Sequence, residues 1–517
     1  MYQNEELYIA HSDKRIVMQG KMANRHGLIA GATGTGKTVT LQVIAETFSQ
    51  AGVPCFMADM KGDLSGISQA GQMSGFIEKR KDEFEVPNPD FEGCPVRFFD
   101  VFGKQGHPLR MKIGDMDSVL LARMLELNET QAGVLNIAMK VAADKKAENE
   151  NDPAWDIIDL KDLKMLLNYV GDHAKEFTVQ YGNISTQSVG AIQRALLAIE
   201  TQGGDKFFGE PALDVTELIA KKGGKGIMSV LAADELFTKP KLYSSFLFCL
   251  LNQIYNRLPE VGDQPLPKLI FFFDEAHTLF ADASAAVLES VERIVRLIRS
   301  KGVGIYFITQ NPADIPDNIL GQLGNRVQHA LRAFTPKDQK GVKAAAQTFR
   351  ANPAFKTEDA IQNLGTGEAL VSFLDEKGAP MMVEQAKILF PLSQIGAITP
   401  EQRTASIQNS DIYGEYEKAK DRESIYETLL ALQEAEEKAK AEEAAAKEAE
   451  KQAAIEAKAK EKAEKEAAKQ KEKEEREKEK EAKKKKSMIM KIITFLGIPA
   501  IIRSIIRGFV TGNKKKR

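Results

Sequence analysis

One segment of the sequence constrains the fold more than any other. Residues 31–38 read GATGTGKT and fit the pattern G-x-x-x-x-G-K-[ST]. The glycines of this pattern let backbone N–H groups curl around a β-phosphate, where a side chain would block the approach. The segment follows an apolar run, HGLIAG, and opens a stretch with helical spacing, TVTLQVIAETFSQAG. A phosphate-binding loop requires this context, so the sequence predicts nucleotide binding rather than an ordinary glycine turn.

Two residues of this loop have expected roles beyond its backbone. Lys37 is expected to bridge β- and γ-phosphate oxygens, and Thr38 to supply a hydroxyl group to Mg²⁺. ATP and Mg²⁺ are therefore the expected ligands. The residues assigned to the nucleotide are Gly31, Ala32, Thr33, Gly34, Thr35, Gly36, Lys37 and Thr38.

A second motif, LIFFFDEAH at residues 269–277, has five apolar residues followed by two acids. This pattern is typical of a buried strand that ends at a polar edge. Asp274 is expected to hold Mg²⁺ through water, and Glu275 to polarise an attacking water, which indicates hydrolysis and not only binding. The alternative is that both acids cap the next helix. No chemistry is assigned to His277.

Two further strand ends carry candidate side chains. The carboxyl ends of parallel strands meet at the ligand edge of a sheet. Gln310, which ends the strand GVGIYFITQ, is expected to sense the γ-phosphate or to orient water, and the alternative is a plain strand-to-loop amide. Asp59, which ends the strand PCFMADM, is expected near the attacking water, with Lys61 and Asp63 close by.

The order of predicted elements indicates an α/β fold with a mostly parallel, doubly wound sheet. Residues 1–26 are interpreted as a short lead-in. Residues 1–104 and 262–395 are predicted to form the core. Residues 105–261 are predicted to be a mainly helical insertion with a short strand near GIMSVLAA.

The C-terminal part changes composition. Residues 411–486 contain almost no Gly or Pro and become rich in Ala, Glu and Lys, which favours one long helix, although a partly disordered charged linker stays open. A sustained apolar seam is missing, so a coiled coil is the weaker interpretation. Residues 441–517 carry a net charge of +9 and residues 1–440 a net charge of −11. An acidic body excludes a uniformly basic nucleic-acid binder.

Residues 487–517 form an apolar tail that basic residues interrupt and flank. Cations inside a membrane-spanning helix are costly, so the pattern favours a helix on an anionic membrane surface, or a tail packed on the body or on another subunit. The three cysteines lie far apart, which excludes a disulfide scaffold, and the acidic start does not suit a signal peptide. We therefore expect a cytoplasmic protein, with a peripheral position at the inner face of the membrane as an option.

Five segments in order, GATGTGKT, ADMKGDLSG, IFFFDEAH, RSKGVGIYFITQNP and QLGNRVQHALRAFTP, resemble the HerA/FtsK superfamily of P-loop ATPases. More narrowly, residues 5–395 look like the bacterial HerA-like ATPases that lack the N-terminal barrel of archaeal HerA. The resemblance implies a RecA-like ASCE core, a hexamer and double-stranded DNA as cargo. It does not imply the nuclease partner that the barrel docks. Catalytic motif positions match Lys37, Thr38, Asp59, Asp274, Glu275 and Gln310.

An arginine from a neighbouring subunit is expected if the sites lie between subunits. The candidates are Arg299 and Arg326, either of which can equally be a surface or helix-end arginine. Three functions follow from the sequence: a ring-forming ATP-driven DNA translocase or helicase, a membrane-associated ATPase acting on a protein partner, and a nucleotide-binding assembly without turnover. Glu275 argues against the third.

Overall fold

The computed structural model describes residues 1–3, 5–281, 285–497 and 499–511. The chain divides into a compact unit from Met1 to Leu429, called the body, and a second unit from Leu430 onward. Residues 498 and 512–517 of the predicted basic tail lie outside the described residues.

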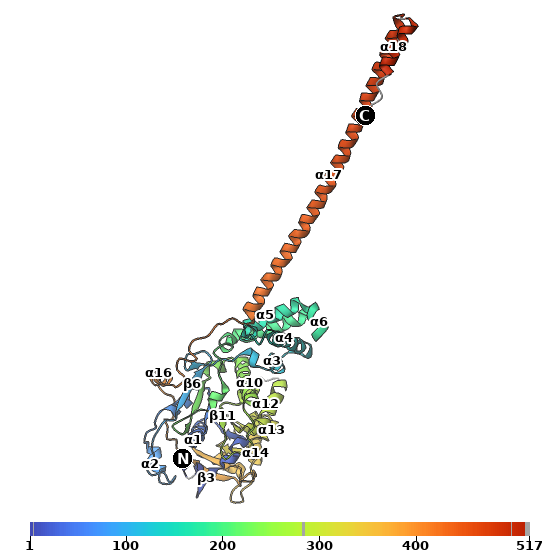
Figure 1. The fold of residues 1–517 in the computed structure, drawn as a ribbon. Helices are drawn as coiled ribbons and strands as arrows, with labels where there is room; N and C mark the ends of the chain where they lie inside the picture. The colour runs from blue at the N-terminus through green and yellow to red at the C-terminus, as the bar shows by residue number, and fades with distance from the viewer. Residues whose placement is uncertain (4, 282–284, 498, 512–517) are drawn as a thin grey trace. The chain divides into compact units, whose positions relative to one another are not determined.

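The body is built on one large sheet of thirteen strands (Figure 1). Its strand order is β1-β2-β15-β14-β13-β4-β12-β11-β5-β10-β6-β7, and β3 pairs with β2. The strands are β1 (Tyr2–Gln3), β2 (Glu6–His11), β3 (Arg15–Met18), β4 (Gly27–Ala30), β5 (Cys55–Asp59), β6 (Val96–Asp100), β7 (His107–Pro108), β10 (Met228–Ala232), β11 (Leu269–Phe273), β12 (Val303–Thr309), β13 (Asn325–Gln328), β14 (Glu368–Ser372) and β15 (Glu384–Ile388).

The strands from β13 to β7 are all parallel. Strand β4, which precedes the phosphate-binding loop, lies between β13 and β12. Strand β11, which precedes the two acids, lies between β12 and β5. The carboxyl ends of β4, β12, β11 and β5 therefore share one edge. The fold is the expected RecA-like α/β arrangement with a mostly parallel, doubly wound sheet.

Alternate residues of the central strands enter two different hydrophobic cores, because side chains of a strand point to opposite faces. Phe271 and Phe273 belong to one core, while Ile270 and Phe272 belong to the other. Both faces are covered, so the continuously apolar strands are buried throughout, as the sequence predicts.

Helices cover both faces of the sheet. Helix α1 packs within the second core, and the helices between β7 and β10 together with α10 and α12 contribute to the first. Figure 1 shows α3, α4, α5 and α6 gathered at one end of the body. The helices of the body are α1 (Lys37–Gln50), α2 (Gly75–Arg80), α3 (Ser118–Met124), α4 (Glu129–Glu148), α5 (Leu160–Asp172), α6 (Ala174–Tyr181), α7 (Thr186–Ile199), α8 (Asp205–Phe207), α9 (Asp234–Phe237), α10 (Pro240–Arg257), α11 (His277–Ala281), α12 (Ala285–Ile298), α13 (Asp317–Leu320), α14 (Pro336–Gln347), α15 (Thr357–Asn363) and α16 (Pro400–Gln408).

One edge of the sheet is antiparallel and departs from the sequence-based expectation. Residues 1–26 are not a plain lead-in, because β1, β2 and β3 extend the sheet there. Strand β2 pairs with β15, which pairs with β14, and β14 runs antiparallel to β13. Strand β13 ends at Gln328, earlier than the apolar segment RVQHALRAF suggests, because the following residues leave the sheet and contribute to a small separate core.

The compact part of the chain extends to Leu429, beyond residue 395 where the sequence places the end of the body. Residues 409–424, called the strap, are not helical apart from turns, and polar contacts tie them to the body. Asp411 accepts two hydrogen bonds from Arg97, at 2.9 and 2.7 Å. Ser424 donates to Asp162 at 2.6 Å, and Leu429 is buried in the core. The body ends later than the sequence suggests because polar and charged contacts hold the strap, and hydropathy does not reveal such contacts.

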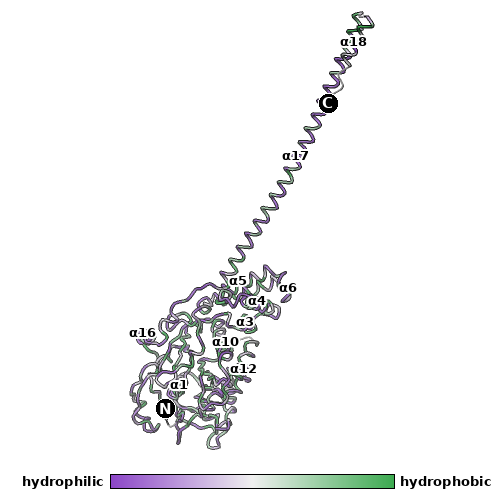
Figure 2. Tube along the Cα trace, viewed as in Figure 1, coloured by the Kyte–Doolittle hydropathy of each residue, from purple (hydrophilic) through white to green (hydrophobic). Residues whose placement is uncertain are grey.

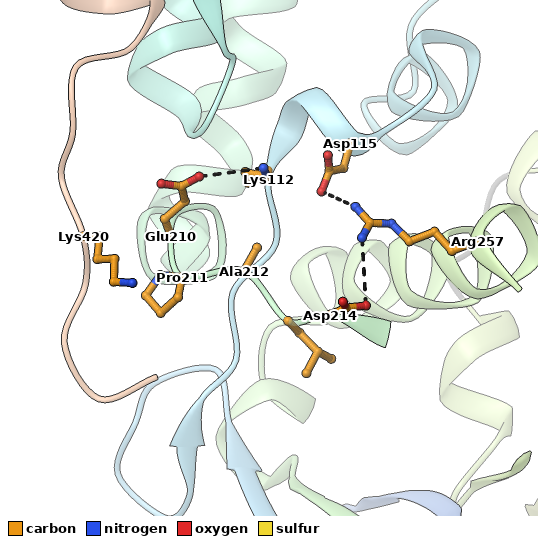
Figure 3. Close-up of a pocket in the computed structure, with 9 residues that line it drawn as sticks. Lys112, Asp115, Glu210, Pro211, Ala212, Asp214, Arg257 and Lys420 are labelled. Atoms are coloured by element: carbon orange, nitrogen blue, oxygen red, sulfur yellow. Dashed lines mark hydrogen bonds and ion pairs between the residues drawn. The ribbon is translucent and has the colours of Figure 1, made fainter. Parts of the chain in front are cut away.

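The strap also borders a cavity of about 310 Å³ (Figure 3). Lys112 lies 3.7 Å from Glu210, and Arg257 lies 2.9 Å from Asp115 and 4.0 Å from Asp214. Lys112 and Arg257 therefore already have acidic partners at this cavity. The backbone N–H of Lys420 donates to the carbonyl of Glu210, which fixes the strap along this side.

The second unit consists of most of helix α17 (Ile425–Phe495) and of helix α18 (Ala500–Thr511). Helix α17 begins fourteen residues after the start of the predicted range 411–486 and continues past its end. Figure 2 shows a largely hydrophilic α17 and a more hydrophobic α18. Among the described residues, no helix combines the length and the apolar character needed to cross a bilayer.

Candidate active site

The phosphate-binding loop leaves the carboxyl end of β4 and is held from both sides. The N–H of Gly31 donates to the carbonyl of Thr309 at 3.2 Å, and the N–H of Ala32 donates to the carbonyl of Ala330 at 2.8 Å. A β-carbon on Gly31, whose φ is +154°, would lie 2.5 Å from the β-carbon of His329. Only glycine fits this position, because the backbone must pass so close to the next strand.

Lys37, the first residue of α1, folds back over this loop. Its ammonium group donates to the carbonyls of Gly31 at 2.7 Å and Ala32 at 3.1 Å. Burial lowers the pKa of Lys37, and the nearby carboxylates of Glu275 and Asp274 oppose that shift. The cation of the loop and the two acids after β11 therefore lie within electrostatic reach of each other.

His329 supports the loop from the end of β13, a role that the sequence does not reveal. Its Nδ1 donates to the carbonyl of Glu368 at 2.9 Å, which leaves Nε2 to accept from the hydroxyl of Thr40 at 2.8 Å. Burial lowers the pKa of His329 to about 4, so the ring is neutral at pH 7. The N–H of Gly367 also donates to the carbonyl of Thr35 at 3.1 Å. Recognising this support requires the knowledge that β13 lies beside β4.

The two acids follow β11 directly. Burial, together with a smaller contribution from the neighbouring Glu275, raises the pKa of Asp274 to about 6. One carboxylate oxygen of Asp274 accepts the N–H of Glu275 at 2.9 Å. Glu275 has a φ of +46°, a left-handed conformation that residues with a β-carbon rarely adopt. Strain of this kind is common at functional sites, where the surrounding structure enforces it.

The carboxylate of Glu275 is held by side chains from two neighbouring strand ends. Lys61 donates to Oε1 at 2.5 Å, and Gln310 donates to Oε2 at 3.3 Å. His277 Nδ1 also lies 3.4 Å from Oε2. Burial alone would raise the pKa of Glu275, but Lys61 and then Gln310 outweigh it and leave the pKa lowered. The structure therefore brings Glu275 and Gln310 together, as the convergence of parallel strand ends predicts.

Asp59 lies at the same edge but uses its oxygens locally. Its carboxylate accepts the N–H groups of Gly62 at 2.8 Å and Leu64 at 3.2 Å. Burial raises the pKa of Asp59 to about 7, and the nearby Asp63 adds to the shift. These bonds shape the loop after β5, and the expected position of Asp59 near an attacking water stays a prediction.

The two candidate arginines have different surroundings. Arg326 is mostly buried and donates to the carbonyls of Leu323, Thr348 and Leu320 at 2.9, 3.2 and 3.0 Å. Burial lowers its pKa. Arg299 is exposed and precedes the amino end of β12, at the edge opposite the phosphate-binding loop. Neither arginine contributes to the site of its own chain.

The residues present fit a nucleotide with Mg²⁺. Among the described residues, no cluster of three or more His, Cys, Asp or Glu side chains suits a metal. Asp274, which follows β11, and Thr38, in the first turn of α1, are the residues that would hold the ion. A cradle of backbone donors, a lysine, and a carboxylate two strands away can direct water onto a terminal phosphate.

Comparison with known proteins places these features in a family. The model of the family described as "Helicase HerA-like C-terminal" matches residues 4–516. Two relatives are each named "DNA double-strand break repair helicase HerA". The protein from Sulfolobus acidocaldarius is 31% identical over 123 residues, 24% of this chain and 23% of the relative. The protein from Sulfurisphaera tokodaii is 22% identical over 375 residues, 70% of this chain and 64% of the relative. The chain thus spans less than two thirds of the length of either curated relative.

Solved structures with a similar chain path have low sequence identity. The bacterial conjugative coupling protein TrwB, without its first 70 residues, is 14% identical with a TM-score of 0.48, and the match covers 74% of this chain and 89% of that one. VirB4 of Thermoanaerobacter pseudethanolicus is 14% identical with a TM-score of 0.46, covering 77% and 97%. At these values the likeness carries no statement about function.

Proposed function

The chain belongs to the family of helicase HerA-like C-terminal domains, and on that premise we propose that it is an ATP-hydrolysing motor that forms a ring and moves double-stranded DNA. The observation that carries the hydrolysis is the carboxylate of Glu275, which Gln310 contacts at the carboxyl edge of the sheet, beside the phosphate-binding loop. A site for binding alone does not need such a carboxylate.

In this proposal each residue of the edge has one task. The backbone of residues 31–38 and Lys37 hold the phosphates. Thr38 and Asp274 would hold Mg²⁺, which when bound neutralises phosphate charge. Glu275 accepts a proton from the attacking water, and Gln310 orients that water or senses the γ-phosphate. Asp59 keeps the adjoining loop in place.

DNA as the cargo is supported by the relatives, whose printed names describe DNA helicases of double-strand break repair. The ring rests on the resemblance of the sequence motifs to the HerA/FtsK superfamily. The net charge of −11 over residues 1–440 gives no separate support for DNA. If a ring forms, Arg299 is the better candidate for an arginine that reaches a neighbour's site. Its side chain is exposed, whereas the N–H groups of Arg326 are already used by three carbonyls.

The test measures phosphate release from ATP with and without duplex DNA, and particle mass on the same sample. We expect Mg²⁺-dependent turnover that duplex DNA raises, at a mass of several subunits. The Lys37→Ala protein should lose turnover. Turnover that is the same at every DNA length and salt concentration would contradict DNA as the cargo. A monomeric mass under turnover conditions would contradict the ring.

A second candidate function is an ATPase that works at an anionic membrane surface on a protein partner. Large apolar side chains of the C-terminal end are exposed, with Phe495 at 91%, and Ile492, Ile501 and Ile505 at about half or more. Lys491 lies among them and KKKK precedes them at residues 483–486. Apolar and basic residues together suit the headgroup region of anionic lipids.

Co-sedimentation with anionic vesicles separates this candidate from the first. The full chain should sediment with the vesicles, and a chain that ends at residue 486 should stay in the supernatant. Equal supernatant fractions for the two chains would remove the membrane surface as a partner. Neutral vesicles serve as the control, because the basic residues contribute only where the lipid is anionic.

A further inference from the structure

The ion pair between Lys61 and Glu275 occupies an oxygen that hydrolysis requires. The ammonium group of Lys61 lies 2.5 Å from Oε1, and Gln310 contacts Oε2. A general base needs an oxygen within hydrogen-bond reach of the water that it activates. With Lys61 on one oxygen and Gln310 on the other, the carboxylate is held rather than free.

Lys61 is placed there by a rigid loop but keeps a movable side chain. Asp59 accepts the N–H groups of Gly62 and Leu64, and Ser65 donates to the carbonyl of Gly62 at 2.8 Å. These bonds fix the backbone around Lys61. The side chain itself is 52% exposed, whereas that of Glu275 is 8% exposed. The lysine can therefore leave without disturbing the core, and the glutamate cannot.

The phosphate-binding loop lies close to Glu275. Lys37 of that loop is close enough for the charges of Glu275 and Asp274 to act on it. A triphosphate bound at the loop would bring several negative charges into the same region and would compete with Glu275 for the ammonium of Lys61. Lys61 thus faces Glu275, Asp274 and Asp63 in the nucleotide-free protein, and would also face phosphate in the loaded one.

We propose that Lys61 is a positioning residue that restrains Glu275 in the nucleotide-free protein and releases it when the phosphate site fills. The proposal rests on the proposed ATP hydrolysis. Its consequence is that the body does not hold an active base before its substrate arrives. Asp59 contributes to this restraint indirectly, because its carboxylate holds the loop from which Lys61 reaches Glu275.

A double-mutant cycle tests the release without relying on turnover. Lys61→Gln, Glu275→Gln and the double variant are unfolded by denaturant, in the full chain. Without nucleotide, the two substitutions should be non-additive, because they remove one shared contact. With a saturating non-hydrolysable ATP analogue and Mg²⁺, the effects should become additive. Non-additivity that persists with the analogue bound would overturn the proposal.

A second test measures ATP turnover. Lys61→Gln should raise kcat/KM for ATP without DNA by about threefold and leave kcat nearly unchanged, because the restraint acts only before the nucleotide binds. Lys61→Arg keeps the ion pair and should stay closer to the wild-type kcat/KM than Lys61→Gln does. Lys104→Gln is the matched control, because Lys104 makes an equally short pair with Glu235 on the surface. A merely structural lesion does not increase kcat/KM.

The outcomes are distinguishable. If the wild-type protein releases no phosphate under any condition, the proposed hydrolysis fails and this proposal fails with it. If the wild-type protein turns over ATP and the kcat/KM of Lys61→Gln is equal to or lower than that of the wild type, only the restraint by Lys61 is overturned.

Discussion

The body and helix α17 hold their charged side chains in opposite environments. In the body, Arg97 is 7% exposed and donates two hydrogen bonds to Asp411. In α17, Lys465 and Glu461 form an i, i+4 pair in which both side chains are more than 60% exposed. A buried polar group is costly to leave without its partner, whereas exposed helix pairs are weak. One substitution should therefore be felt in the body and hardly at all in the helix.

The largest effect is expected at Glu275. Glu275→Gln should lower kcat by about 10²- to 10⁴-fold, the usual contribution of a general base, while the protein still binds nucleotide. Phosphate release and binding of a fluorescent ATP analogue measure the two quantities. The matched variant in α17 is Glu443→Gln, which breaks an exposed pair with Lys447 and should leave turnover unchanged. A Glu275→Gln protein within tenfold of the wild-type kcat would contradict the assignment.

The support of the phosphate-binding loop comes next. His329→Ala removes the hydrogen bonds to Glu368 and Thr40, and should raise the KM for ATP by about tenfold, since a buried partner left unsatisfied costs roughly 1–3 kcal/mol. His329→Gln, which keeps one donor and one acceptor, should recover part of the loss. An unchanged KM in both variants would show that the loop keeps its shape without this ring.

The same histidine gives a pH dependence. Its pKa is lowered from 6.5 to about 4 in the folded body, so the unfolded chain binds more protons between these values. The stability that the neutral ring contributes is complete above pH 6.5 and is lost as the pH falls toward 4. The wild-type protein should therefore lose free energy of unfolding more steeply over this range than His329→Gln. If the free energy of unfolding fell with pH equally steeply in the two proteins, the result would contradict a buried neutral ring at His329.

The sequence predicts those parts of the site that depend on one strand and its end. Asp274, Glu275 and Gln310 follow apolar runs, and a doubly wound sheet brings such ends to one edge. His329 and the pair between Lys61 and Glu275 depend on which strands are neighbours, and hydropathy does not encode this order.

Two further differences have the same origin. The strands in residues 1–26 are short, and β2 and β3 gain their stability from pairing with each other and with β15, far along the chain. The strap is polar and irregular, yet Arg97 and Asp162 in the body bind it. Local pattern is informative where the contacts are local, as in α17, and incomplete where the partner is distant in sequence.

A stability measurement sharpens the comparison between buried and exposed pairs. Asp411→Asn should lower the free energy of unfolding of the body by about 1–3 kcal/mol, because it leaves the buried guanidinium of Arg97 without its charged partner. Glu461→Gln in α17 should change it by less than about 0.5 kcal/mol. Denaturant unfolding followed by tryptophan fluorescence reports on the body, because Trp155 is buried there. If the two variants changed the free energy of unfolding equally, buried and exposed ion pairs would not differ in their contribution to stability.

The smallest effect on turnover is expected from removing the second unit. A chain that ends at Leu429 keeps Ile425 and Leu429 in the core and keeps the bond from Ser424 to Asp162. Its turnover without DNA should stay within about twofold of the full chain, which is well under one tenfold step in rate.

A chain that ends at residue 409 is the matched control, because it also removes the strap. It loses the partners of Arg97 and Asp162 and exposes core residues, so its thermal midpoint should fall while that of the longer truncation holds. If the two truncated chains had the same thermal midpoint, the strap would contribute no more to the stability of the body than the exposed helix does. If the chain ending at Leu429 lost turnover, the second unit would take part in the chemistry of the body.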